Sequence, residues 1–147
     1  MPNPVFLFRP QFVVRGGIGG YMRFAKIVFW IAGVWGILVI TPLYFMLETI
    51  GRQTPPALTH PQFYFGFLGV TLAWQIAFFI IATDPVRFRP MIVPSIIEKL
   101  TFIGAITVLY LQRRIVFSEA IPAFPDAILA TLFAISFAKT HSNTLRP

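Results

Sequence analysis

The chain has 147 residues, of which 56% are hydrophobic and only 12% are charged, and its mean hydropathy is +0.76. These values lie outside the range of soluble globular proteins, and seventeen Phe residues exclude an intrinsically disordered chain. Because the chain contains no Cys, disulfides, thiolate metal sites, iron–sulfur clusters and CxxC redox chemistry are also excluded.

Four apolar segments of roughly 17 to 23 residues each are long enough to cross a hydrocarbon core of about 30 Å. They cover residues 24–46, 63–83, 91–111 and 121–138. Short connections favour antiparallel neighbours, so we expect an all-α fold, a polytopic membrane protein with an antiparallel four-transmembrane-helix bundle. The fourth segment is the weakest, and Pro122 and Pro125 predict that its continuous helix begins near Asp126.

The segments on either side of the transmembrane region differ from it in composition. Residues 1–23 mix Phe and Arg with a glycine run at positions 16–20, and residues 139–147 form a short polar tail. The glycine run lacks the preceding strand and the spacing of a phosphate-binding loop. We therefore expect residues 1–23 to be a lead that lies on the lipid headgroups, and 139–147 to be a cytoplasmic tail.

The distribution of Lys and Arg predicts the orientation of the chain. Nine of these residues fall on the side of the N-terminus and three on the opposite side. The nine are Arg9, Arg15, Arg23, Lys26, Arg87, Arg89, Lys99, Lys139 and Arg146, and the three are Arg52, Arg113 and Arg114. Positive residues are retained in the cytoplasm, so both termini are expected there, with a bacterial inner membrane as the expected location. The charge of +7 then indicates contact with membrane lipids rather than with nucleic acid.

Charged residues cluster between the second and third apolar segments. Pro85 disfavours a helical Asp84, which predicts that the second helix ends there. The candidate ion-pair cluster consists of Asp84, Arg87, Arg89, Glu98 and Lys99. We expect this cluster to form a structural latch between the second and third helices, with a ligand or proton site at Glu98 and simple solvation as the alternatives.

Gln75 is the main polar residue near the middle of the membrane, about 18 Å from the start of its segment. Polar side chains on the second segment could face a similar stripe on the third across one cavity. The candidate ligand-binding residues are Tyr64, Thr71, Trp74, Gln75, Glu98 and Thr101. The alternative for Gln75 is a hydrogen bond that joins two helices, as polar residues in membrane bundles commonly make.

No residue pattern indicates a cofactor, a metal or a reaction. His60 and His141 lie on opposite sides of the membrane and cannot ligate one haem iron. The sequence shows no nucleophile elbow and no Ser-His-Asp set, so no catalytic residue is assigned. An enzyme acting on a lipid remains an alternative without a pattern that favours it.

Several short motifs carry a resemblance to a known group of proteins. These are His60-Pro61 followed by Phe63-Tyr64, then Trp74-Gln75, then the run from Asp84 to Pro90, and Glu98-Lys99. Between about Met22 and Arg114, the chain resembles an uncharacterised family of small bacterial four-helix integral membrane proteins. Its architecture is also similar to the DoxX-like proteins, and the resemblance implies a four-helix fold without implying a reaction.

Three functions fit these observations. The first is a non-enzymatic protein that binds a lipid-like or small apolar molecule between its helices, with Gln75 as the polar anchor. The second is an accessory subunit or assembly factor of a larger membrane complex. The third is an oligomeric proton-coupled transporter in which Glu98 carries the proton.

Overall fold

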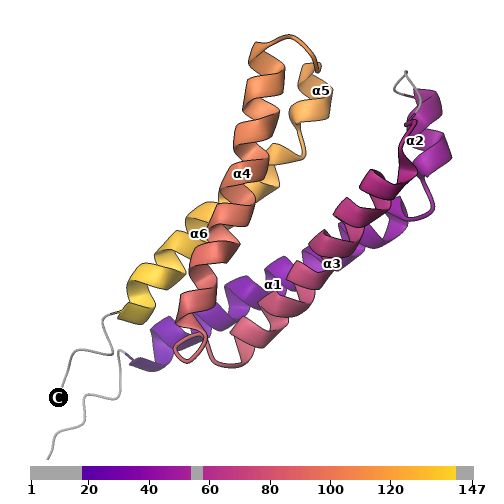
Figure 1. The fold of residues 1–147 in the computed structure, drawn as a ribbon. Helices are drawn as coiled ribbons and strands as arrows, with labels where there is room; N and C mark the ends of the chain where they lie inside the picture. Colours follow the sequence, from indigo (N-terminus) through magenta and orange to yellow (C-terminus); the bar gives the residue numbers. More distant parts are fainter. Residues whose placement is uncertain (1–17, 54–57, 142–147) are drawn as a thin grey trace, which may run out of the picture.

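The structure is a computed structural model that describes residues 18–53 and 58–141. Within these ranges, four helices are long and apolar enough to cross a membrane, and the regular structure is helical throughout. The all-α fold with four transmembrane helices, expected from the sequence, is therefore confirmed (Figure 1). Residues 1–17 and 142–147 of the expected lead and tail lie outside the described residues.

The first membrane helix is shifted toward the N-terminus relative to its predicted range. Helix α1 (Ile18–Leu43) begins before Phe24 and ends directly after Pro42. Residues 44–46 instead form turns, in which the amide of Phe45 donates to the Pro42 carbonyl at 3.0 Å. A short helix, α2 (Leu47–Gln53), follows. Helix α1 therefore ends one residue after Pro42, before the predicted end at residue 46.

The second and third membrane helices are joined by a tight connection. Helix α3 (Pro61–Thr83) has Pro61 in its first turn and is capped at its C-terminus by Asp84, as Pro85 predicts. A 3-10 turn, η1 (Arg89–Met91), leads directly into α4 (Ile92–Leu111).

The fourth membrane crossing is interrupted. Helix α5 (Phe117–Ala120) and helix α6 (Ala123–His141) are separated by Ile121 and Pro122. Together they span a stretch long enough to cross a membrane, Phe117–Thr140. Helix α6 begins before Asp126, so the predicted start of the continuous helix is slightly late, and Asp126 lies in the first turn.

The helices form two antiparallel hairpins that meet at one end. Helix α1 packs along α3, α4 packs along α6, and α1 also contacts α6. Figure 1 shows the hairpins close together near the connection between α3 and α4, and diverging toward α2 and α5. The antiparallel bundle is thus tightly packed over only part of its length.

An aromatic core joins the hairpins where they meet. The rings of Phe29 on α1 and Phe133 on α6 are stacked with centroids 4.4 Å apart. Phe78 on α3 meets the Phe133 ring edge-on at 5.2 Å. All three side chains are fully buried, so this cluster fixes how one hairpin sits on the other.

Candidate functional site

A cavity of about 850 Å³ lies between the two hairpins, directly beyond the aromatic core. Ala32 and Leu129 belong both to the buried residues of the core and to the cavity wall, so the cavity begins where the core ends. The walls are mostly apolar. The lining residues are Ala32, Trp35, Gly36, Val39, Ile40, Leu43, Phe67, Val70, Thr71, Trp74, Gln75, Glu98, Lys99, Thr101, Phe102, Ile121, Pro122, Pro125, Asp126 and Leu129.

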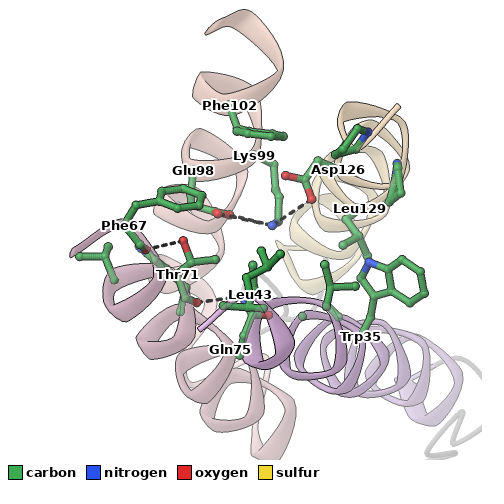
Figure 2. A pocket seen from close by; sticks show the side chains of 18 of the residues that line it. Trp35, Leu43, Phe67, Thr71, Gln75, Glu98, Lys99, Phe102, Asp126 and Leu129 are labelled. Carbon is green, nitrogen blue, oxygen red and sulfur yellow. Dashed lines mark hydrogen bonds and ion pairs between the residues drawn. The ribbon is translucent and has the colours of Figure 1, made fainter. Parts of the chain in front are cut away.

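A charged group stands on the wall formed by α4 and α6. The Lys99 ammonium lies 3.2 Å from Glu98 Oε2 and 3.1 Å from Asp126 Oδ1. Figure 2 shows the ammonium between the two carboxylates. The Lys99 side chain is only 7% exposed, and those of Glu98 and Asp126 are 22% and 17% exposed. We call Glu98, Lys99 and Asp126 the charged triad.

The triad contains more negative than positive charge. Two carboxylates face one ammonium, which leaves one negative charge when all three groups are ionised. Glu98 Oε2 is buried and receives no hydrogen bond, although the Lys99 ammonium lies within ion-pair distance. In a membrane interior, such a surplus charge is unfavourable unless a partner offsets it.

The interruption of the fourth crossing places Asp126 in the triad. Helix α6 starts beside the cavity, and Ile121, Pro122 and Pro125 line the wall next to Asp126. A carboxylate in the first turn of a helix is favoured by the positive end of the helix dipole. Sequence reasoning placed Asp126 at a helix start but did not pair it with Lys99. The missing information was which helices become neighbours, because α4 and α6 face each other across the triad.

Gln75 lies on the opposite wall, and its amide stays within its own helix. Its Nε2 donates to the Thr71 carbonyl at 2.9 Å, and the residue is only 2% exposed. Its Oε1 lies so close to Gly36 on α1 that a Cβ added to Gly36 would overlap it. Gln75 thus makes no hydrogen bond between helices within the described part of the chain, and it contributes to packing of α1 against α3.

Most of the predicted ligand-binding residues line one cavity. Thr71, Trp74 and Gln75 come from α3, and Glu98 and Thr101 come from α4. The hydroxyls of Thr71 and Thr101 donate to the backbone carbonyls of Phe67 and Glu98.

Tyr64 does not line this cavity. Its hydroxyl donates to the Leu43 carbonyl at 2.7 Å and ties the start of α3 to the end of α1.

The predicted ion-pair cluster is divided into two separate parts: Asp84, Arg87 and Arg89 lie near the connection between α3 and α4, and Glu98 and Lys99 belong to the triad. Asp84 Oδ1 accepts a hydrogen bond from the backbone amide of Arg87 at 3.1 Å, within the turn that follows α3. The Arg89 guanidinium stacks on the Phe137 ring at 3.8 Å. Among the described residues, no ion pair links Asp84, Arg87 or Arg89 to the triad. Lys99 therefore joins α4 to α6, and the expected latch between the second and third membrane helices is not formed by ion pairs.

The comparisons with known proteins leave the chain without an assigned relative. No family model, no curated protein and no solved structure matches it. The resemblance to small bacterial four-helix proteins stays a prediction. Within residues 18–53 and 58–141, no group of three or more His, Asp or Glu side chains is placed to hold a metal ion.

Proposed function

We propose that this integral membrane protein binds a lipid-like amphiphile in the cavity between its two hairpins. The observation that carries the proposal is the combination of an apolar cavity of about 850 Å³ with one charged wall. Sites for small molecules are typically apolar cavities of about 300 to 1,000 Å³ with a few polar groups that orient the ligand. The apolar part of the ligand would lie along Trp35, Val39, Phe67 and Val70, and its polar end at the triad.

The interrupted fourth crossing supports a binding role. Non-helical backbone at membrane depth is tolerated where it is buried in protein or lines a cavity. The break at Ile121 and Pro122 lines this cavity.

We also infer that both termini lie in the cytoplasm. The excess of Lys and Arg on the side of the N-terminus supports this orientation. In this orientation, the hairpins meet toward the cytoplasm and diverge toward the outer leaflet, where α2 and α5 lie (Figure 1). An amphiphile would then enter from the outer half of the bilayer.

Native mass spectrometry of the protein extracted gently from its own membrane tests the proposal. The wild type is expected to carry a discrete small-molecule adduct, and Thr71→Trp is expected to lose it because the larger indole would project into the cavity from α3 and take up space that the ligand needs. Thr107→Trp is the matched control. Thr107 is also a helical Thr whose hydroxyl bonds the carbonyl four residues earlier, but it lies outside the cavity lining.

The outcomes separate the three functions considered from the sequence. An adduct lost from Thr71→Trp and kept by Thr107→Trp supports an amphiphile-binding protein. A defined protein partner without an adduct would replace the proposal with an accessory subunit. A stable oligomer with neither adduct nor partner would favour the transporter hypothesis instead.

A further inference from the structure

We propose that the bound amphiphile has a cationic amine head held by the carboxylates of Asp126 and Glu98. This inference rests on the proposed function, because it specifies the chemistry of the ligand in the same cavity. It follows from the balance of charge, the balance of hydrogen-bond donors and acceptors, and the aromatic side chains on the lining.

The charge of the triad disfavours an anionic ligand. A buried Lys beside a cavity would ordinarily suggest a site for a fatty acid or a phosphate. Here the Lys99 ammonium is already shared between two carboxylates at 3.2 and 3.1 Å. An anionic head would bring a third negative group next to one ammonium, where the attraction between unlike charges could not offset the repulsion between like charges.

In the described part of the chain, the hydrogen bonds and ion pairs on the polar part of the lining leave two carboxylate oxygens without a hydrogen bond. The Gln75 amide and the hydroxyls of Thr71 and Thr101 all donate to backbone carbonyls of their own helices. The structure gives Asp126 Oδ2 no partner among the described residues, and Glu98 Oε2 receives no hydrogen bond. The wall therefore presents unused acceptors, which a ligand satisfies by donating N–H groups.

Aromatic rings on the lining also suit a cation. The indoles of Trp35 and Trp74 and the ring of Phe102 line the same cavity as the triad. Figure 2 shows Phe102 on α4, the helix that carries Glu98 and Lys99, and Trp35 on α1, which belongs to the other hairpin. Ammonium groups are attracted to the faces of aromatic rings, and most strongly to that of Trp. Carboxylates combined with aromatic faces make a lining suited to an alkylammonium head.

Intrinsic fluorescence in nanodiscs of zwitterionic lipid tests the inference with three matched ligands: dodecylamine, dodecanol and dodecanoate. The protein carries Trp30→Phe, because Trp30 lies outside this cavity and would add background, whereas Trp35 and Trp74 report on the lining. Affinities are expressed per mole fraction of ligand in the bilayer. Dodecylamine is expected to bind about tenfold tighter than dodecanol, as a hydrogen bond to a charged group implies, and dodecanoate weakest.

Two variants and a control decide which groups cause the preference. Asp126→Asn, or Glu98→Gln if the first does not fold, should reduce the amine preference to about threefold or less and leave dodecanol binding unchanged. Glu48→Gln removes an acid that pairs with Arg52 on α2, outside the cavity, and should keep the full preference.

The failures are distinguishable. Equal binding of dodecylamine and dodecanol would overturn the amine inference and leave the proposed amphiphile site intact. Equal binding is the result expected if Glu98 or Asp126 is protonated, because the triad then carries no surplus negative charge. A preference that survives both triad variants would overturn it as well. Absence of binding by all three ligands would overturn the proposed function itself.

Discussion

At the residue scale, the close approach of α1 and α3 depends on Gly33 and Gly36 of α1, which lie against Phe79 and Gln75 of α3. Gly36 leaves room for the Gln75 side chain, whose Oε1 occupies the space that a Cβ would need. The Gln75 amide is also held by its hydrogen bond to the Thr71 carbonyl, which a shift away from Gly36 would disturb. Gln75 was singled out from the sequence, but only the structure shows that its position depends on Gly36.

Gly36→Ala should destabilise the protein by about 1 to 3 kcal/mol, as overpacking typically does. Gly104→Ala is the control, since a Cβ at that position on α4 meets nothing within 4 Å. Unfolding by SDS in mixed micelles measures both variants. Equal stability of the two variants would show that Gln75 relaxes without cost.

The charged triad makes a second prediction at this scale. Lys99→Met leaves two carboxylates facing each other without a cation, and removing one partner of a buried ion pair costs about 3 to 5 kcal/mol. Replacing the whole triad (Glu98→Gln, Lys99→Met, Asp126→Asn) should recover stability to within about 1 kcal/mol of the wild type, because no uncompensated charge remains. The same SDS unfolding reports both values. A triple variant as unstable as Lys99→Met would mean that the triad holds the hairpin through its geometry rather than its charge balance.

Which of these residues could be predicted from the sequence depends on how far each contact reaches along the chain. Glu98 and Lys99 are adjacent, and the helical spacing of Thr71 and Gln75 is readable from periodicity. Asp126 forms its ion pair with Lys99 because α4 and α6 pack together. The Arg89 guanidinium stacks on the Phe137 ring of α6 for the same reason. Contacts of this kind depend on helix pairing, which a single sequence does not specify.

At the element scale, two helix boundaries lie next to prolines, and the sequence predicted the late start of the fourth helix but not the early end of α1. All four apolar segments became helices, since length and hydropathy suffice for that. Helix α1 ends one residue after Pro42, and Ile121 and Pro122 separate α5 from α6. In both places, the apolar run continues past the break, so hydropathy alone could not find the boundary.

The aromatic core of Phe29, Phe78 and Phe133, which joins the two hairpins, should contribute strongly to stability. Phe133→Ala should destabilise the protein by about 3 kcal/mol, because the vacated space lies against the fully buried Phe29 and Phe78. Phe124→Ala, on the same helix but 55% exposed, should cost less than about 1 kcal/mol. A double-mutant cycle between Phe29→Ala and Phe133→Ala should show a coupling of about 0.5 to 1.5 kcal/mol. Zero coupling would contradict a joint made by ring stacking.

At the scale of the whole molecule, the orientation can be tested cleanly because the chain has no Cys. Leu58→Cys lies just before α3, and Lys139→Cys lies near the end of α6. With both termini in the cytoplasm, a membrane-impermeant maleimide should label Leu58→Cys in intact cells and Lys139→Cys only after permeabilisation. The reverse pattern would invert the proposed entry side of the cavity.

The arrangement of the hairpins was the part of the fold that the sequence left open. Four spans and short connections predict antiparallel neighbours, and these are present. Divergence of the hairpins beyond the Phe29, Phe78 and Phe133 core, and hence the cavity, depends on packing at one end of the molecule (Figure 1). The cavity and Glu98 on its lining were expected from two polar stripes, but the ion pair between Lys99 and Asp126 was not.

Photo-crosslinking in the membrane tests the amphiphile site most directly. An alkylamine and an alkyl alcohol, each with a diazirine in its alkyl chain, are added at increasing amounts to membranes that contain the protein. The modified residues are then mapped by mass spectrometry. We predict saturable labelling of the cavity residues Phe67, Phe102 and Leu129 that an unlabelled analogue competes away. Labelling of the exposed residues Ile76 and Val108, which lie outside the cavity, should rise linearly and resist competition. Linear, uncompeted labelling at all five positions would contradict a binding site between the hairpins.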